Sequence, residues 1–88
     1  MTNNTLKLLR RTAKEELGRC QLTNPHLCVE LIDWIVDGGQ RPQGEIEPRE
    51  QGILYGAIEE GVRAAYGDSL FSSIDRDILS RRQEVTNV

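Results

Sequence analysis

Apolar residues recur every three or four positions through most of this chain, and that spacing constrains its fold more than any other feature. The segment from Thr5 to Arg19, with Asn4 placed to cap it, carries one such apolar stripe: Leu6, Leu9, Ala13, Leu17 and Cys20. An α-helix turns once in about 3.6 residues, so a stripe with this spacing lies on one helical face. Apolar and polar residues never alternate for more than a few positions, which argues against β-strands. The sequence therefore predicts an all-α fold.

Local signals mark the second helix at both ends. Asn24 precedes Pro25, and this pair is typical of a helix start, because asparagine caps free backbone N–H groups and proline fits the first turn. We expect this helix to run to about Asp37 and to end at Gly38-Gly39, since glycine accepts left-handed backbone angles. Pro42 and Gly44 favour a connecting loop up to Glu47.

The third helix is predicted over Pro48–Tyr66, with Gly67 as its terminator, and a fourth is expected to begin near Asp68 and to fray after Arg82. With 88 residues, the chain is expected to form one domain, 1–88, a single compact bundle of about four helices. Its core is predicted from the apolar stripes: Leu9, Leu31, Ile35, Leu54, Ile58, Val62, Phe71, Ile74 and Ile78.

Charge is distributed unevenly along the chain, whose net charge is −3. Residues 1–19 carry five basic and two acidic residues, whereas residues 20–68 carry nine acidic residues and three arginines. The first helix presents a basic stripe, which comprises Lys7, Arg10, Arg11 and Lys14. The second presents an acidic stripe, which comprises Glu30, Asp33 and Asp37. Both stripes are interpreted either as solvated helix faces or as surfaces that bind a partner.

Two further features are consistent with binding. Trp34 lies beside the acidic stripe, on the flank of an apolar face, and is either a core residue or an interface anchor, because tryptophan is enriched at binding hot spots. Ala57, Gly61 and Ala65 are spaced by four residues and form a smooth ridge on the third helix. This ridge favours either a tight crossing within the chain or a groove for a second helix, including that of another copy.

One short motif resembles a known modification site. Gly67-Asp68-Ser69-Leu70 is similar to the Asp-Ser-Leu triplet on which carrier proteins hold a phosphopantetheine arm. In that family the triplet opens the second of four helices, and about 40 residues follow it, whereas here only residues 71–88 follow Leu70. A junction between two helices explains the motif better, so we expect no cofactor.

Cys20, His26 and Cys28 lie within nine residues, which raises the question of a metal site. Zinc prefers four ligands, usually with closely paired cysteines, and this set offers three candidates without such a pair. We therefore expect both cysteines to be core thiols and His26 to be exposed, with a disulfide or a metal site as alternatives. No catalytic cluster is evident, and the paired acids, such as Glu59-Glu60, are expected to be solvated.

The sequence thus predicts a small, acidic, cytoplasmic protein that is not an enzyme and that binds a protein partner, with self-association open. Small stand-alone acidic helical proteins are often phage or mobile-element products that block a host machine, for example as anti-defence proteins. That expectation follows from size and class. The alternative is a nucleic-acid-binding protein that uses the basic stripe. No apolar run approaches the roughly 18 residues that span a bilayer, so no membrane partner is expected.

Overall fold

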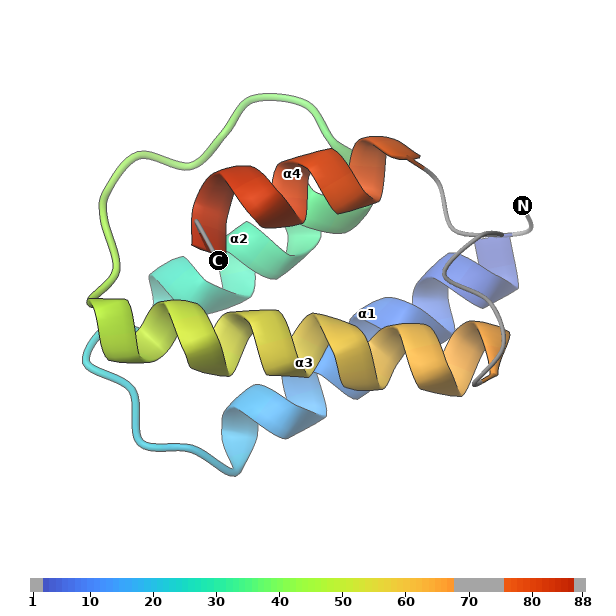
Figure 1. Ribbon diagram of the computed structural model, residues 1–88, viewed down its shortest axis with the longest axis horizontal. Coiled ribbons are helices and arrows are strands. Elements are labelled where there is room, and N and C mark those ends of the chain that lie inside the picture. The colour runs from blue at the N-terminus through green and yellow to red at the C-terminus, as the bar shows by residue number, and fades with distance from the viewer. Residues whose placement is uncertain (1–2, 68–75, 87–88) are drawn as a thin grey trace.

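The computed structural model describes residues 3–67 and 76–86. These ranges contain four α-helices and the segments that connect them (Figure 1). The helices are listed here in chain order: α1 (Asn3–Gly18), α2 (Pro25–Asp37), α3 (Pro48–Tyr66) and α4 (Arg76–Thr86). The described ranges contain no strand, so the predicted all-α bundle is confirmed.

α1 packs against both α2 and α3. α3 lies along α1 and makes its most extensive contacts there, while α4 lies against both α2 and α3 (Figure 1). The Cα radius of gyration is 11.9 Å, which is what a chain of this length has when it is folded compactly. The core between the helices is largely aliphatic: Leu9, Ala13, Leu17, Leu27, Cys28, Leu31, Ile32, Trp34, Ile35, Val36, Leu54, Ala57, Ile58, Val62, Ile78 and Val85.

Seven of the predicted core residues are described, and each is at most 1% exposed: Leu9, Leu31, Ile35, Leu54, Ile58, Val62 and Ile78. The helical phases that the apolar stripes predicted are therefore confirmed for all four helices. Phe71 and Ile74, also predicted to be core, lie outside the described residues. The same holds for the triplet Asp68-Ser69-Leu70 and for the predicted start of the fourth helix.

The predicted bounds of the second and third helices are confirmed. Asn24 caps α2 through its Oδ1 atom, which accepts a hydrogen bond from the N–H of Leu27 at 3.2 Å. Gly38 ends α2 at φ +81°, a backbone conformation that residues with a Cβ atom rarely adopt. Gly67 ends α3 at the same φ, so both terminators act as the sequence predicted.

The two outer helices differ from their predicted bounds. α1 begins at Asn3, so Asn4 lies inside the helix and the prediction that it caps the helix is wrong. α4 continues to Thr86, so the prediction of fraying after Arg82 is wrong as well. Val85 and Thr86 are buried, and the Thr86 hydroxyl donates a 2.8 Å hydrogen bond to the carbonyl of Arg82. Burial against the other helices holds this last turn in place.

A long loop over residues 38–47 arches from the end of α2 to the start of α3 (Figure 1). It is held to the bundle at Gly44, where φ is +123° and a Cβ atom would lie 2.9 Å from a Leu27 methyl group. Only glycine fits this close approach without displacing the leucine. The loop therefore runs back from the C-terminal end of α2 to a contact with the first turn of the same helix.

Candidate functional site

Trp34 lies where α2, the loop and solvent meet. Its indole belongs to the core cluster and is 8% exposed. The indole Nε1–H donates a 3.1 Å hydrogen bond to the carbonyl of Gly39, which fixes the ring edge to the loop. The guanidinium carbon of Arg41 lies over the ring, 5.7 Å from its centroid. The two interpretations of Trp34 are thus compatible, since the ring is a core residue with one side toward a surface hollow.

This hollow, called the Trp34 hollow below, has a volume of about 530 Å³. It is lined by the acidic stripe and the loop: Glu30, Asp33, Trp34, Asp37, Gly38, Gln40, Arg41, Pro42 and Gln43. Three carboxylates thus share one depression with an indole and a proline ring. The position of Trp34 beside the acidic residues could be predicted from the sequence. Only the folded structure shows that the loop completes the lining of the hollow.

The basic and acidic stripes meet across the contact between α1 and α2. Arg10 Nη1 donates to both carboxylate oxygens of Asp37, at 2.6 and 2.7 Å. Lys14 Nζ lies 2.8 Å from Asp33 Oδ1, and Arg10 Nε lies 4.0 Å from the same oxygen. These four residues of the two stripes therefore form one ion-pair network that links the helices.

The remaining stripe residues have a different environment. Lys7 and Glu30 are exposed, and neither forms an ion pair within the described ranges. Arg11 pairs along its own helix with Glu15 at 3.7 Å, where both side chains are well exposed and the pair contributes little stability. Lys7 and Glu30 therefore carry the stripe charges that the bundle itself does not neutralise.

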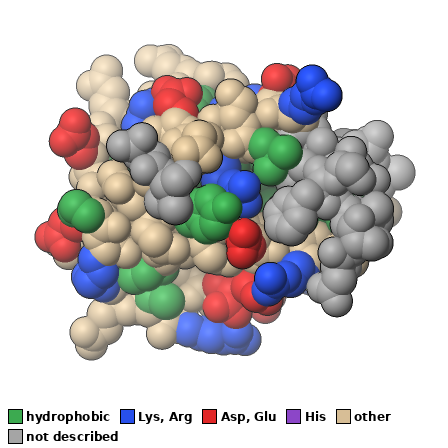
Figure 2. Space-filling view, in the orientation of Figure 1, with side chains coloured by type: hydrophobic (Ala, Val, Ile, Leu, Met, Phe, Trp, Pro, Cys, Tyr) green, Lys and Arg blue, Asp and Glu red, His purple; other side chains and the backbone are tan. Residues whose placement is uncertain are grey.

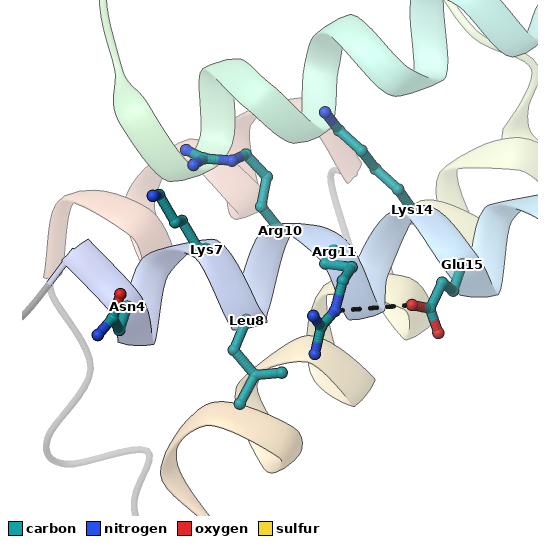
Figure 3. A pocket seen from close by; sticks show the side chains of 7 residues that line it. All are labelled: Asn4, Lys7, Leu8, Arg10, Arg11, Lys14 and Glu15. Carbon is teal, nitrogen blue, oxygen red and sulfur yellow. Dashed lines mark ion pairs between the residues drawn. The ribbon is translucent and has the colours of Figure 1, made fainter.

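A second and larger hollow, of about 810 Å³, borders the basic side of α1 (Figure 3). Figure 3 shows Lys7, Arg10 and Lys14 extending to one side of the helix, and Leu8, Arg11 and Glu15 to the other. Its lining thus includes all four residues of the basic stripe. Two of these, Arg10 and Lys14, already face carboxylates of α2, which reduces the positive potential available to an anionic partner.

The small-residue ridge of α3, formed by Ala57, Gly61 and Ala65, packs against α1. Ala57 is 2% exposed, Ala65 packs at the edge of the core, and a Cβ atom on Gly61 would lie 2.5 Å from the Leu9 carbonyl oxygen. The ridge is therefore occupied by a helix of the same chain. At Gly61 it leaves no space for a helix of a partner.

The cysteines occupy different environments. Cys28 is buried, and burial raises the pKa of its thiol, with a smaller contribution from the negative charge of Glu50. Cys20 is exposed after the end of α1, so the prediction that it is a core thiol is wrong. Both thiols are free, and His26 is exposed as expected. Among residues 3–67 and 76–86, no group of three His, Cys, Asp or Glu side chains is placed to hold a metal ion.

Glu50 is a buried carboxylate that the sequence analysis did not single out. Its Oε2 atom accepts hydrogen bonds from the N–H groups of Thr23 and Asn24, at 2.8 and 3.3 Å, and its Oε1 accepts one from Glu47 N at 3.3 Å. Burial raises its pKa, but these three N–H groups and the Arg49 guanidinium outweigh that effect, so the pKa lies below its ordinary value. Glutamate at the third helical position was the available signal, and it points to a structural cap.

Two adjacent arginines of α4 were also missed, and they differ sharply. Arg81 donates from Nε to the carbonyl of Ile35 at 2.9 Å and from Nη2 to that of Val36 at 3.3 Å, at the negative end of α2. Arg82 is 8% exposed and stacks 4.2 Å from the Tyr55 ring centroid. Its Nε and Nη1 atoms are buried and have no hydrogen-bond partner among residues 3–67 and 76–86.

Hydrophobic side chains on the face shown in Figure 2 lie in small groups separated by charges of both signs. No helix in the described ranges is long and apolar enough to cross a membrane. No model of a known protein family matches the chain, and comparisons with curated proteins and with solved structures found no match.

Proposed function

We propose that this chain is a small non-catalytic protein-binding module that contacts its partner at the Trp34 hollow. The observation that carries the proposal is the hollow itself, in which an indole and Pro42 lie within a rim of charged side chains. Aromatic anchors inside a polar rim are typical of the residues that dominate protein–protein affinity. The further prediction of a phage or mobile-element inhibitor rests on size and class, and it stays a prediction.

The alternative is binding of nucleic acid on the basic side of α1. The hollow of about 810 Å³ beside Lys7 and Arg11 favours it, because phosphate binding depends on clustered basic side chains. The ion pairs of Arg10 and Lys14 with α2 count against it, as does the net charge of −3. We therefore rank it second.

Two charge reversals separate these functions. Glu30→Lys alters the Trp34 hollow and Lys7→Glu alters the α1 hollow, and neither breaks an ion pair within the described residues. The tagged chain and both variants would be used to capture partners from an extract of the native host, with and without nuclease. Circular dichroism would confirm that each variant keeps its helices.

We expect a nuclease-resistant protein partner whose affinity falls at least about tenfold, or roughly 1.4 kcal/mol, in Glu30→Lys but not in Lys7→Glu. Capture that requires nucleic acid and is lost in Lys7→Glu would establish the alternative instead. A partner that binds both folded variants as tightly as the wild type would exclude the Trp34 hollow as the contact surface.

A further inference from the structure

Arg41 lines the Trp34 hollow and lies over the indole in the free chain. Its guanidinium lies over the Trp34 ring at 5.7 Å, and its Nη1 donates to Glu84 Oε1 of α4 at 2.9 Å. The chain's own loop thus places a planar cation between an aromatic face and a carboxylate, which is the environment that guanidinium groups favour.

The remaining lining of the hollow also favours a cation. Of its three acidic residues, Asp33 and Asp37 are paired with α1, whereas Glu30 has no ion pair among the described residues. A positive group that entered here would meet an uncompensated carboxylate beside the indole. An anionic group would be repelled by the carboxylates of Glu30, Asp33 and Asp37, and it could not form a cation–π interaction with the Trp34 ring.

Arg41 is weakly held in this position. Its side chain is 41% exposed and that of Glu84 is 53% exposed, so solvent screens their ion pair. Arg41 also lies on the loop, between the glycines Gly39 and Gly44, both of which adopt positive φ angles. The indole, by contrast, is held by its own hydrogen bond to Gly39 and by the core, so its position does not depend on Arg41.

From these contacts we infer that the Trp34 hollow recognises an arginine side chain of the partner, and that Arg41 holds its place in the free chain until the partner displaces it. This inference rests on the proposed function and specifies the group that is bound. If Arg41 competes with the arginine of the partner for the indole, its presence must weaken the affinity for the partner. Removal of Arg41 should therefore tighten binding, although it deletes a residue that lines the site.

A nona-arginine peptide is a suitable probe, since Trp34 is the only tryptophan and its fluorescence reports on the hollow directly. The test compares the wild type with Arg41→Gln, which removes the competing guanidinium, and with Glu84→Gln, which removes only its ion pair. Arg63→Gln is the matched control, because it changes net charge equally and Arg63 pairs with Glu60 within α3. A nona-glutamate peptide tests the opposite charge.

We expect saturable binding of nona-arginine at constant ionic strength, with Arg41→Gln about three- to tenfold tighter than Arg63→Gln. Glu84→Gln changes net charge in the opposite sense, so its matched control is Glu60→Gln, which breaks the Arg63 pair instead. Glu84→Gln should bind nona-arginine more tightly than Glu60→Gln, and this comparison serves if Arg41→Gln does not fold. An Arg41→Gln affinity equal to or weaker than that of Arg63→Gln would overturn the displacement, while leaving the protein-binding proposal intact.

Failure of every folded variant to bind nona-arginine, or binding of nona-glutamate in its place, would overturn the assignment of an arginine as the recognised group. The proposed function would then still be judged by the capture experiment with Glu30→Lys, whose readout does not depend on this peptide. The two failures are thus distinguishable.

Discussion

The carbonyl oxygen of Leu9 lies 2.5 Å from the position that a Cβ atom on Gly61 would occupy, so α1 and α3 cross too closely at this point to admit a side chain. Gly56, five residues earlier on α3, has no side chain and no other helix of the described residues within 4 Å of its own Cβ position. The two glycines of α3 therefore have different surroundings, and substitutions at the two positions should have opposite effects on stability.

Gly61→Ala is expected to destabilise the chain by about 1–3 kcal/mol, because the added methyl group must push the backbone of α1 away. Gly56→Ala should instead stabilise it by up to about 1 kcal/mol through better helix propensity. Urea unfolding followed by circular dichroism measures both. Equal changes in the free energy of unfolding for the two alanine variants would contradict the close crossing. Gly61→Leu should lower the free energy of unfolding by more than Gly61→Ala does.

The ion pair between Arg10 and Asp37 can be tested by charge exchange. Arg10→Glu should lower the free energy of unfolding, because it replaces an attraction across the helix contact with a repulsion between carboxylates. For a half-exposed pair the attractive part is about 0.2–1 kcal/mol. The double variant Arg10→Glu with Asp37→Arg should recover part of this loss. Strictly additive effects of the two single changes would show that the pair is not coupled.

Glu50 should make the stability of the chain sensitive to acid. Its folded pKa is lowered from the ordinary 4.5, so its contribution is complete above that value and is lost as the pH falls through the folded pKa. Urea midpoints measured from pH 7 to pH 3 should therefore fall less steeply with acid in Glu50→Gln than in the wild type. At pH 7 that variant should be the less stable of the two.

Glu45→Gln is the control for this series, since Glu45 is exposed and forms no side-chain hydrogen bond or ion pair within the described residues. It should keep the full acid sensitivity of the wild type. An unchanged pH profile in Glu50→Gln would mean that the three backbone N–H groups do not hold the carboxylate in its charged form.

Arg81→Met is expected to destabilise the chain by about 1–2 kcal/mol, because the carbonyls of Ile35 and Val36 would lose a charged donor at the end of α2. Arg81→Lys should recover part of the loss, since an ammonium group still interacts favourably with the helix dipole but cannot reproduce two hydrogen bonds. Thermal unfolding of the three proteins measures the order. A lysine variant no better than methionine would show that the charge does not contribute.

The adjacent Arg82 should behave in the opposite way. Two nitrogens of this buried guanidinium lack a hydrogen-bond partner in the part of the chain that the structure describes, which is costly, and stacking on Tyr55 offsets only part of that cost. Arg82→Met keeps most of the packing volume, so we expect anything from no change to a gain of about 2 kcal/mol in stability. A loss comparable to that of Arg81→Met would show that the stacked cation stabilises the fold.

The sequence by itself determined where α2 and α3 begin and end and which faces of all four helices are buried. Asn24, Pro25, Gly38 and Gly67 act within one helical turn, so their effects follow from local backbone geometry. The apolar stripes fix each buried face for the same reason, because their period is that of the helix itself.

Tertiary structure alone decided which side chains meet. Glu50 accepts hydrogen bonds from residues 26 and 27 positions earlier, and Arg10 reaches an aspartate 27 positions later, so no local spacing indicates either contact. The Trp34 hollow likewise required Arg41 to return over the indole and join Glu84, 43 positions away. Contacts of this kind depend on how the helices cross, which is set by packing of the whole core.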